Sequence, residues 1–169
     1  MRKTAAFWIN HLNLSEHIEG GAYRRMYASD LVLGKDQLPS HFNGERPICT
    51  SIYFLLQQGQ ISRLHRIASD ETWHFYFGDP LIIHEIQSDG KLRSHLLGQD
   101  PIAGQLLQTT VKAGSWFGAI PAPGSEYALT GCTVSPGFDF EEFELAERSM
   151  VLEKFPQHAD IIDLLCNSR

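Results

Sequence analysis

A chain of 169 residues, 43% of them hydrophobic, has the size of one domain and can bury a substantial core. Its net charge of −6 at pH 7 argues against nucleic-acid or anionic-membrane partners, which require a basic surface. Cys49, Cys132 and Cys166 form no CxxC pair, so we expect no disulfide framework and favour a reducing, cytoplasmic location. No segment approaches the ~20 apolar residues of a membrane helix.

Short elements follow one another along the chain. Apolar spacing predicts a helix over residues 3–14, and a glycine pair within 19–26 predicts a turn that runs into a strand. Residues 34–47 are rich in Gly, Pro, Ser and charge, which predicts a surface loop long enough to act as a lid. Further strands are expected over 48–56, 63–67, 71–77, 81–86, 92–97, 106–112, 115–120 and 127–134. The segment 148–166 predicts a helix broken at Pro156.

Many short strands separated by turn residues indicate an all-β sandwich or barrel. The sequence contains no repeat of fixed period, no low-complexity tract and no linker. We therefore expect a single domain over residues 1–169, with the barrel itself over about 19–146.

One stretch of the sequence carries most of the information about the fold. It resembles the first motif of the cupin superfamily, G-x5-H-x-H-x3-4-E-x6-G, with Gly59, His65, Glu71 and Gly78 at the motif's offsets. Ile67 stands where the motif has its second histidine. The second cupin motif, P-x-G-x2-H, is similar to residues 112–117, but the proline is replaced by lysine and the histidine by phenylalanine.

The resemblance narrows to one branch of the superfamily. The runs 17–21, 69–75, 78–81 and 131–140 are similar to those of the type-5 cupins, a family of unknown function. This resemblance implies a double-stranded β-helix, or jelly-roll barrel, with short flanking helices, paired as a homodimer. The architecture is also similar to that of the sugar-nucleotide 3,5-epimerases. The resemblance implies no particular reaction.

In a typical cupin, the motif histidines and glutamate hold a metal ion. Here only His65 and Glu71 remain, because Ile67 and Phe117 occupy the other two ligand positions. A catalytic first-row metal needs about three protein ligands and an open position. We therefore expect no metal and no other cofactor, and we expect His65 to bond to Glu71 in a polar pocket. A divalent ion on these two residues is the less favoured alternative.

Proton transfer is the second kind of chemistry that the motif permits. A histidine oriented by a carboxylate can serve as a general base, which gives His65 a catalytic role. The epimerases that this fold resembles also use an acid on the opposite side, often a tyrosine. Tyr53 lies on the strand before the motif and is the candidate for this role, with a wall aromatic as the alternative.

Four further side chains are candidates for ligand contacts. Arg24 is expected in the barrel mouth, where a guanidinium suits a carboxylate or phosphate, and Arg25 should then face the other way. A salt bridge from Arg24 to Asp139 or Glu141 is the alternative. His74 is a candidate ligand residue, although strand alternation places it opposite Glu71 unless a bulge intervenes. Trp116 is expected in the core, with a possible second role as an apolar floor for a ligand.

Three functions remain open at this point. The first is an isomerase or epimerase acting on a carbohydrate-like or anionic small molecule, with His65 as the base. The second is a non-catalytic protein that binds a small molecule in the same pocket. The third is a metal-dependent enzyme such as a dioxygenase, which the missing ligands disfavour. The sequence does not separate the first two, because one fold hosts many functions.

Overall fold

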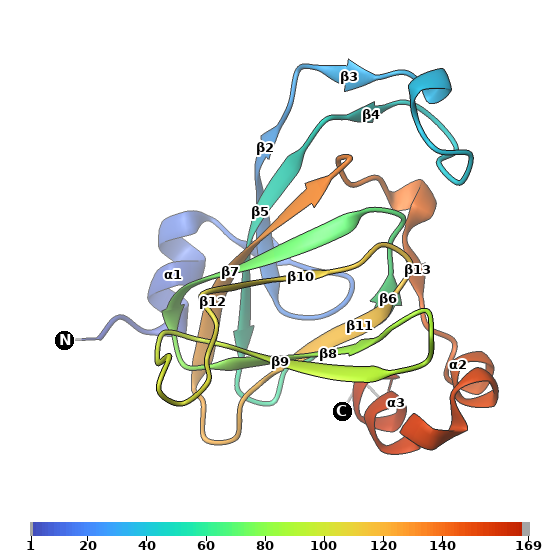
Figure 1. Ribbon diagram of the computed structural model, residues 1–169. Coiled ribbons are helices and arrows are strands. Elements are labelled where there is room, and N and C mark those ends of the chain that lie inside the picture. Colours follow the sequence, from blue (N-terminus) through green and yellow to red (C-terminus); the bar gives the residue numbers. More distant parts are fainter. Residues whose placement is uncertain (1, 167–169) are drawn as a thin grey trace.

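The structure is a computed structural model that describes residues 2–166. Two antiparallel sheets face each other and form a barrel, with helices attached outside it (Figure 1). The elements are α1 (Ala5–Leu12), β1 (Ser15–Glu16), β2 (Ala22–Ala28), β3 (Val32–Leu33), η1 (Lys35–Gln37), β4 (Arg46–Pro47), β5 (Thr50–Gln57), β6 (Ser62–Arg66), β7 (Asp70–Gly78), β8 (Leu81–Ile86), β9 (Leu92–Leu97), β10 (Gln108–Val111), β11 (Trp116–Pro121), β12 (Tyr127–Ser135), η2 (Phe140–Glu142), β13 (Glu144–Leu145), α2 (Arg148–Lys154), η3 (Pro156–His158) and α3 (Ala159–Cys166).

The strand order confirms the predicted jelly-roll barrel with short flanking helices. One sheet runs β1-β2-β5-β12-β7-β10, and the facing sheet runs β13-β6-β11-β8-β9. Strands far apart in sequence therefore lie side by side, as in the pairing of β12 with both β5 and β7. No helix within residues 2–166 is long and apolar enough to cross a membrane.

The core lies between the two sheets and fills one part of the barrel. Inward-facing residues alternate along each strand and form one hydrophobic cluster, which includes Leu56, Trp73, Ile83 and Phe117. A second cluster packs α2 and α3 against the outer face of the five-stranded sheet, and a third packs α1 against the six-stranded sheet. The helices thus cover the outside of the barrel and leave part of its interior free for a cavity.

The segment expected as a loop over 34–47 belongs to an arm that projects beyond the barrel between β2 and β5 (Figure 1). It contains η1 and reaches β4, which pairs with β3. Arg46 is buried and bonds to Glu142, whose Oε1 also accepts the backbone N–H of Asn43 at 2.9 Å. The arm is therefore tied to the η2 segment by a buried ion pair.

A polar chain links the two sheets along one edge of the barrel. His95 on β9 bonds through Nδ1 to the Thr109 hydroxyl on β10 at 2.9 Å, and its Nε2 lies 3.1 Å from Glu85 Oε2 on β8. Glu85 is 1% exposed and also accepts the backbone N–H of Lys112. These bonds connect β9 to β10, which share no strand pairing.

Candidate functional site

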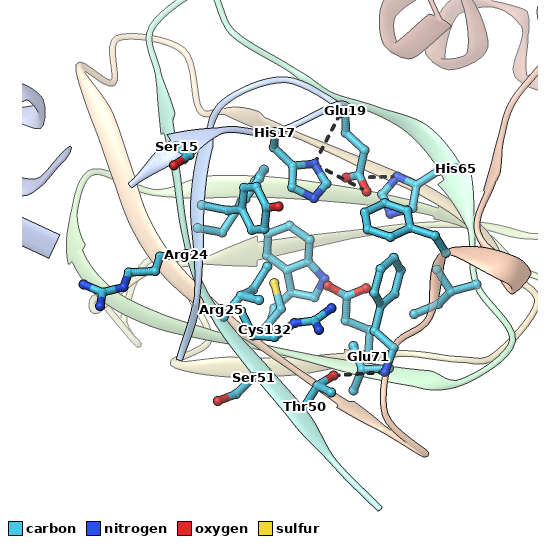
Figure 2. Close-up of a pocket in the computed structure, with 18 residues that line it drawn as sticks. Ser15, His17, Glu19, Arg24, Arg25, Thr50, Ser51, His65, Glu71 and Cys132 are labelled. Atoms are coloured by element: carbon cyan, nitrogen blue, oxygen red, sulfur yellow. Dashed lines mark hydrogen bonds and ion pairs between the residues drawn. The ribbon is translucent and has the colours of Figure 1, made fainter. Parts of the chain in front are cut away.

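The interior of the barrel holds a cavity of about 470 Å³ (Figure 2). It lies between the six-stranded sheet, β6 and the η2 segment. Most of its wall is apolar, and its polar groups gather in one region. The lining residues that the argument uses are His17, Glu19, Tyr23, Arg25, Ile52, Phe54, His65, Ile67, Glu71, Trp73, Cys132, Val134, Phe138 and Phe140.

The turn between β1 and β2 positions two of the polar side chains. His17 and Glu19 are joined locally, because the backbone N–H of Glu19 donates to His17 Nδ1 at 3.2 Å. Gly20 and Gly21 follow with φ of +110° and +73°, and a Cβ added at Gly20 would overlap the backbone carbonyl oxygen of Ile61. The double glycine lets the chain reverse close to the start of β6, and this close approach brings the carboxyl of Glu19 into the cavity.

Glu19 lies at the centre of the polar cluster. Its Oε2 accepts a hydrogen bond from the Ser62 hydroxyl at 2.9 Å and lies 3.4 Å from His65 Nδ1. His65 Nδ1 donates to the backbone carbonyl of Arg63 at 2.6 Å. In the neutral ring this bond places the proton on Nδ1, so Nε2 keeps a lone pair that can accept a proton. The expected His65–Glu71 hydrogen bond is absent from the described residues, and the nearest carboxyl oxygen belongs to Glu19.

Burial sets the charges of this cluster. It raises the pKa of Glu71 to about 7, against the opposing effects of His65 and of a hydrogen bond from Cys132. Burial also raises the pKa of Glu19 to about 7, although His17 and the Ser62 bond act in the opposite direction. The pKa of His65 is lowered by the same burial. The cluster therefore combines an uncharged imidazole with carboxyl groups that gain and lose protons near neutral pH.

Arg24 and Arg25 both line the cavity, as expected for Arg24, but their guanidinium groups point in different directions. The Arg25 guanidinium points into the cavity towards Glu71, whereas that of Arg24 points away from it (Figure 2). Arg24 donates instead to the carbonyl of Leu12 at 3.0 Å. The reason is the phase of β2, in which Tyr23 pairs opposite the inward-facing Phe54. Alternation from that point turns position 25 inward and position 24 outward.

Two predicted site residues lie on the outer face of the same sheet, so placing them in the cavity was wrong. Tyr53 and His74 both pair opposite Gly131 and share its row across β5, β12 and β7. Tyr53 contacts Tyr76 edge-on at 5.7 Å between ring centroids, and His74 Nε2 bonds to Thr133 at 3.0 Å. The phase of β7 follows the strand alternation, which places Glu71 and Trp73 inside the barrel and His74 outside.

Tyr23, and not Tyr53, is the tyrosine of the cavity, and Trp116 is not among the aromatic residues that line it. Tyr23 lines the cavity and packs edge-on against His17, with ring centroids 4.5 Å apart. Trp116, expected as an apolar floor, is 4% exposed and packs against the C-terminal helices, under the guanidinium of Arg66. Its ring faces away from the cavity, because Trp116 pairs opposite Ile86, which packs in the same outer cluster.

The metal positions of the motif are filled by hydrophobic side chains. Ile67 lines the cavity, and the Phe117 ring lies 4.1 Å from the ring of His65. Within residues 2–166, no three His, Cys, Asp or Glu side chains are placed to share one ion. His65 and Glu71 could supply at most two ligands here, so the donor set does not suit a catalytic first-row metal.

Comparison with known proteins agrees with this architecture. Residues 6–146 match the cupin superfamily family described as Cupin_5, a domain of unknown function (DUF985). The chain belongs to this type-5 cupin family. No curated protein matches its sequence.

Two solved structures are similar to this chain over almost its full length. A hypothetical protein from Leishmania major is 36% identical, with a TM-score of 0.88 and coverage of 98% of this chain and 100% of that one. A protein from Shewanella oneidensis is also 36% identical, with a TM-score of 0.86 and coverage of 99% of both chains. Oxalate decarboxylase from Bacillus subtilis is 14% identical, with a TM-score of 0.53 over 91% of this chain and 38% of that one. This last similarity concerns the cupin fold alone.

Proposed function

We propose that this type-5 cupin binds a small anionic molecule inside its barrel and transfers a proton on that molecule, as an isomerase does. One observation carries the proposal. The Arg25 guanidinium points into a cavity whose other polar groups include His65, Glu19 and Glu71. The guanidinium suits an anionic group, and a neutral imidazole beside carboxyl groups of near-neutral pKa suits general acid–base catalysis.

The catalytic roles follow from the hydrogen bonds of the cluster. We assign His65 Nε2 as the base, because Nδ1 is committed to the carbonyl of Arg63. A protonated Glu19 or Glu71 is the acid. We propose that this chemistry needs no metal, since Ile67 and Phe117 occupy the remaining ligand positions of the cupin motif. A reducing cytoplasmic location fits the three free cysteines and is part of the same proposal.

The first test compares the two neighbouring arginines. We expect Arg25→Gln to weaken the binding of small anions by about 10–100-fold, because it removes a charged hydrogen-bond donor from the cavity. Arg24→Gln is the matched control and should reduce anion affinity much less, since Arg24 lines the cavity with its guanidinium turned outward. Thermal-shift screening of organic acids and sugar phosphates, followed by calorimetry, measures both. Equal effects of the two variants would mean that the site lies elsewhere.

A second part of the proposal concerns assembly into homodimers. The projecting arm exposes Leu31 by 68% and Val32 by 49%, and Ile48 beside them is also exposed. Apolar side chains grouped on a projecting element are typical of a surface that another chain covers. We expect light scattering to give twice the 19.1 kDa mass of one chain. We expect Leu31→Lys combined with Val32→Lys to give the single-chain mass, and a wild-type monomer at micromolar concentration would contradict the proposal.

A further inference from the structure

The chemical class of the ligand can be narrowed from the charges around the cavity. Arg25 has no hydrogen bond or ion pair within residues 2–166, whereas Arg24 bonds to the carbonyl of Leu12 and Arg46 pairs with Glu142. A guanidinium keeps its charge at every physiological pH. Arg25 is an exposed residue, so water solvates this charge until an anion replaces that water.

The carboxyl groups of the cavity are weak competitors for this guanidinium. Burial holds Glu19 and Glu71 close to half-protonated at neutral pH, with the pKa of each about 7. Each also has its own partner, which is Ser62 for Glu19 and Cys132 for Glu71. The Arg25 guanidinium is therefore free to pair with an anionic ligand.

The rest of the wall selects against ligands that carry many hydroxyl groups. The apolar lining side chains come from β5, from β12, from the residue after β6 and from the segment that leads into η2. They are Ile52, Phe54, Ile67, Val134, Phe138 and Phe140. A sugar in this space would turn several hydroxyls towards hydrocarbon, and each unsatisfied polar group costs about 1–3 kcal/mol. An apolar body on a single anionic head avoids that cost.

A buried donor adds a requirement for an oxygen acceptor. Trp73 lines the cavity and is 2% exposed, and its indole Nε1–H has no hydrogen-bond partner within residues 2–166. Buried N–H groups without an acceptor are rare in folded proteins. A ligand oxygen atom that reaches Nε1 after a shift of the neighbouring side chains would accept this hydrogen bond.

We infer that the ligand is a short 2-oxo carboxylic acid with an apolar side chain, and that the protein interconverts its keto and enol forms. This inference rests on the proposed function. The carboxylate pairs with Arg25, the apolar side chain packs on the aromatic wall, and the 2-oxo group makes the C3–H acidic enough to be removed. The site thus matches an aryl- or alkyl-substituted 2-oxo acid and not a carbohydrate.

The proton transfer balances without any co-reactant. The C3–H bond breaks and its proton moves to Nε2 of His65, while the electron pair forms a double bond between C2 and C3. The carbonyl oxygen takes a proton from the neutral carboxyl of Glu19 or Glu71. The product is the enol, and nothing is oxidised or reduced. Return of a proton from the imidazolium to C3 regenerates the keto acid, and in D2O this return introduces deuterium at C3.

The test follows proton exchange at C3 and uses phenylpyruvate as the probe. In D2O, we expect wild-type protein to speed the loss of the C3 proton signal, read by NMR, by ~10²-fold over buffer. His65→Asn should abolish the acceleration and Arg25→Gln should reduce it, while Arg24→Gln should retain most of it. Binding is measured separately by calorimetry with phenylacetate, which is anionic, with phenylacetamide, its neutral analogue, and with glucuronate, an anionic sugar.

The outcomes separate this inference from the proposed function. Binding of phenylacetate but not of phenylacetamide or glucuronate, together with C3 exchange, supports the inference. Binding of glucuronate in preference to phenylacetate overturns the ligand class and leaves the proposed anion site standing. Binding of phenylacetate without C3 exchange overturns the keto–enol reaction. Failure of every anion to bind overturns the proposed function as well.

Discussion

Replacing Gly20 with alanine is expected to destabilise the protein by about 4 kcal/mol or more, within the range of the most damaging single substitutions. Gly20 has φ of +110°, a conformation that residues with a side chain rarely adopt. An added Cβ would also overlap the backbone carbonyl oxygen of Ile61, which cannot rotate away as a side chain can. Since Glu19 precedes this turn, the strain should also displace its carboxyl from Ser62 and His65.

Gly59→Ala is the matched control, because it has the unfavourable φ without the overlap. Gly59 has φ of +79°, and nothing lies within 4 Å of the position of its Cβ. Only the backbone penalty applies there, so we expect a loss of about 1–2 kcal/mol. Urea denaturation measures the free energy of unfolding of both variants. If the two variants lose the same stability, the close approach of Gly20 to the Ile61 carbonyl does not constrain this turn.

The strands of the barrel could be predicted because their signals are local. Residues 81–86 and 92–97 form β8 and β9 with the predicted bounds, and Asp89-Gly90 forms the turn between them. Apolar alternation marks such strands, and turn residues mark their ends. The arm was expected to be a plain loop, because β3 and β4 have two residues each and depend on pairing with one another.

Some residues of the site could be predicted from the sequence and others could not, for a physical reason. The spacing of the cupin motif identified His65 and Glu71, which both line the cavity. Glu19 was missed because it reaches His65 only through contacts between the turn and β6, which the sequence does not display. Glu19 lies within the run 17–21, which is part of the family resemblance, and this run is the signal in the sequence that could have identified it.

The errors in orientation come from the phase of single strands. Arg24 and Arg25 are adjacent and identical in type, so only the face of β2 separates their roles. Counting inward from Tyr23, which faces Phe54, would have selected Arg25. The error for Tyr53 is of the same kind, because Tyr53 is an aromatic residue on β5, a strand that lines the cavity, but its side chain faces outward. Tyr23 is the tyrosine that lines the cavity. Residue type is therefore predicted better than the face on which it lies.

Glu71→Gln is expected to change the free energy of unfolding, relative to wild type, by an amount that depends on pH. The variant should gain about 3 kcal/mol on wild type between pH 4 and pH 8. Burial, the main cause, raises the pKa of Glu71 from 4.5 to about 7 in the folded protein. Below pH 4.5 the carboxyl is protonated in both states and has no effect. Between pH 4.5 and 7 the unfolded chain releases the proton and the folded protein retains it, so wild-type stability falls. Glutamine keeps the volume of the neutral acid and removes this titration.

Glu142→Gln gives a control of opposite sign. Burial alone would raise the pKa of Glu142, but its bonds to Arg46 and to the backbone N–H of Asn43 outweigh burial and lower it. Stability from this carboxylate is present above pH 4.5 and is lost as pH falls through the folded pKa, so Glu142→Gln should cost most near neutral pH. Chemical denaturation at intervals from pH 4 to 8 measures both variants. A stability difference between Glu71→Gln and wild type that stays constant with pH would show that the pKa of Glu71 is the same in the folded and unfolded protein. Glu71 would then be ionised at neutral pH and would be removed as a candidate acid.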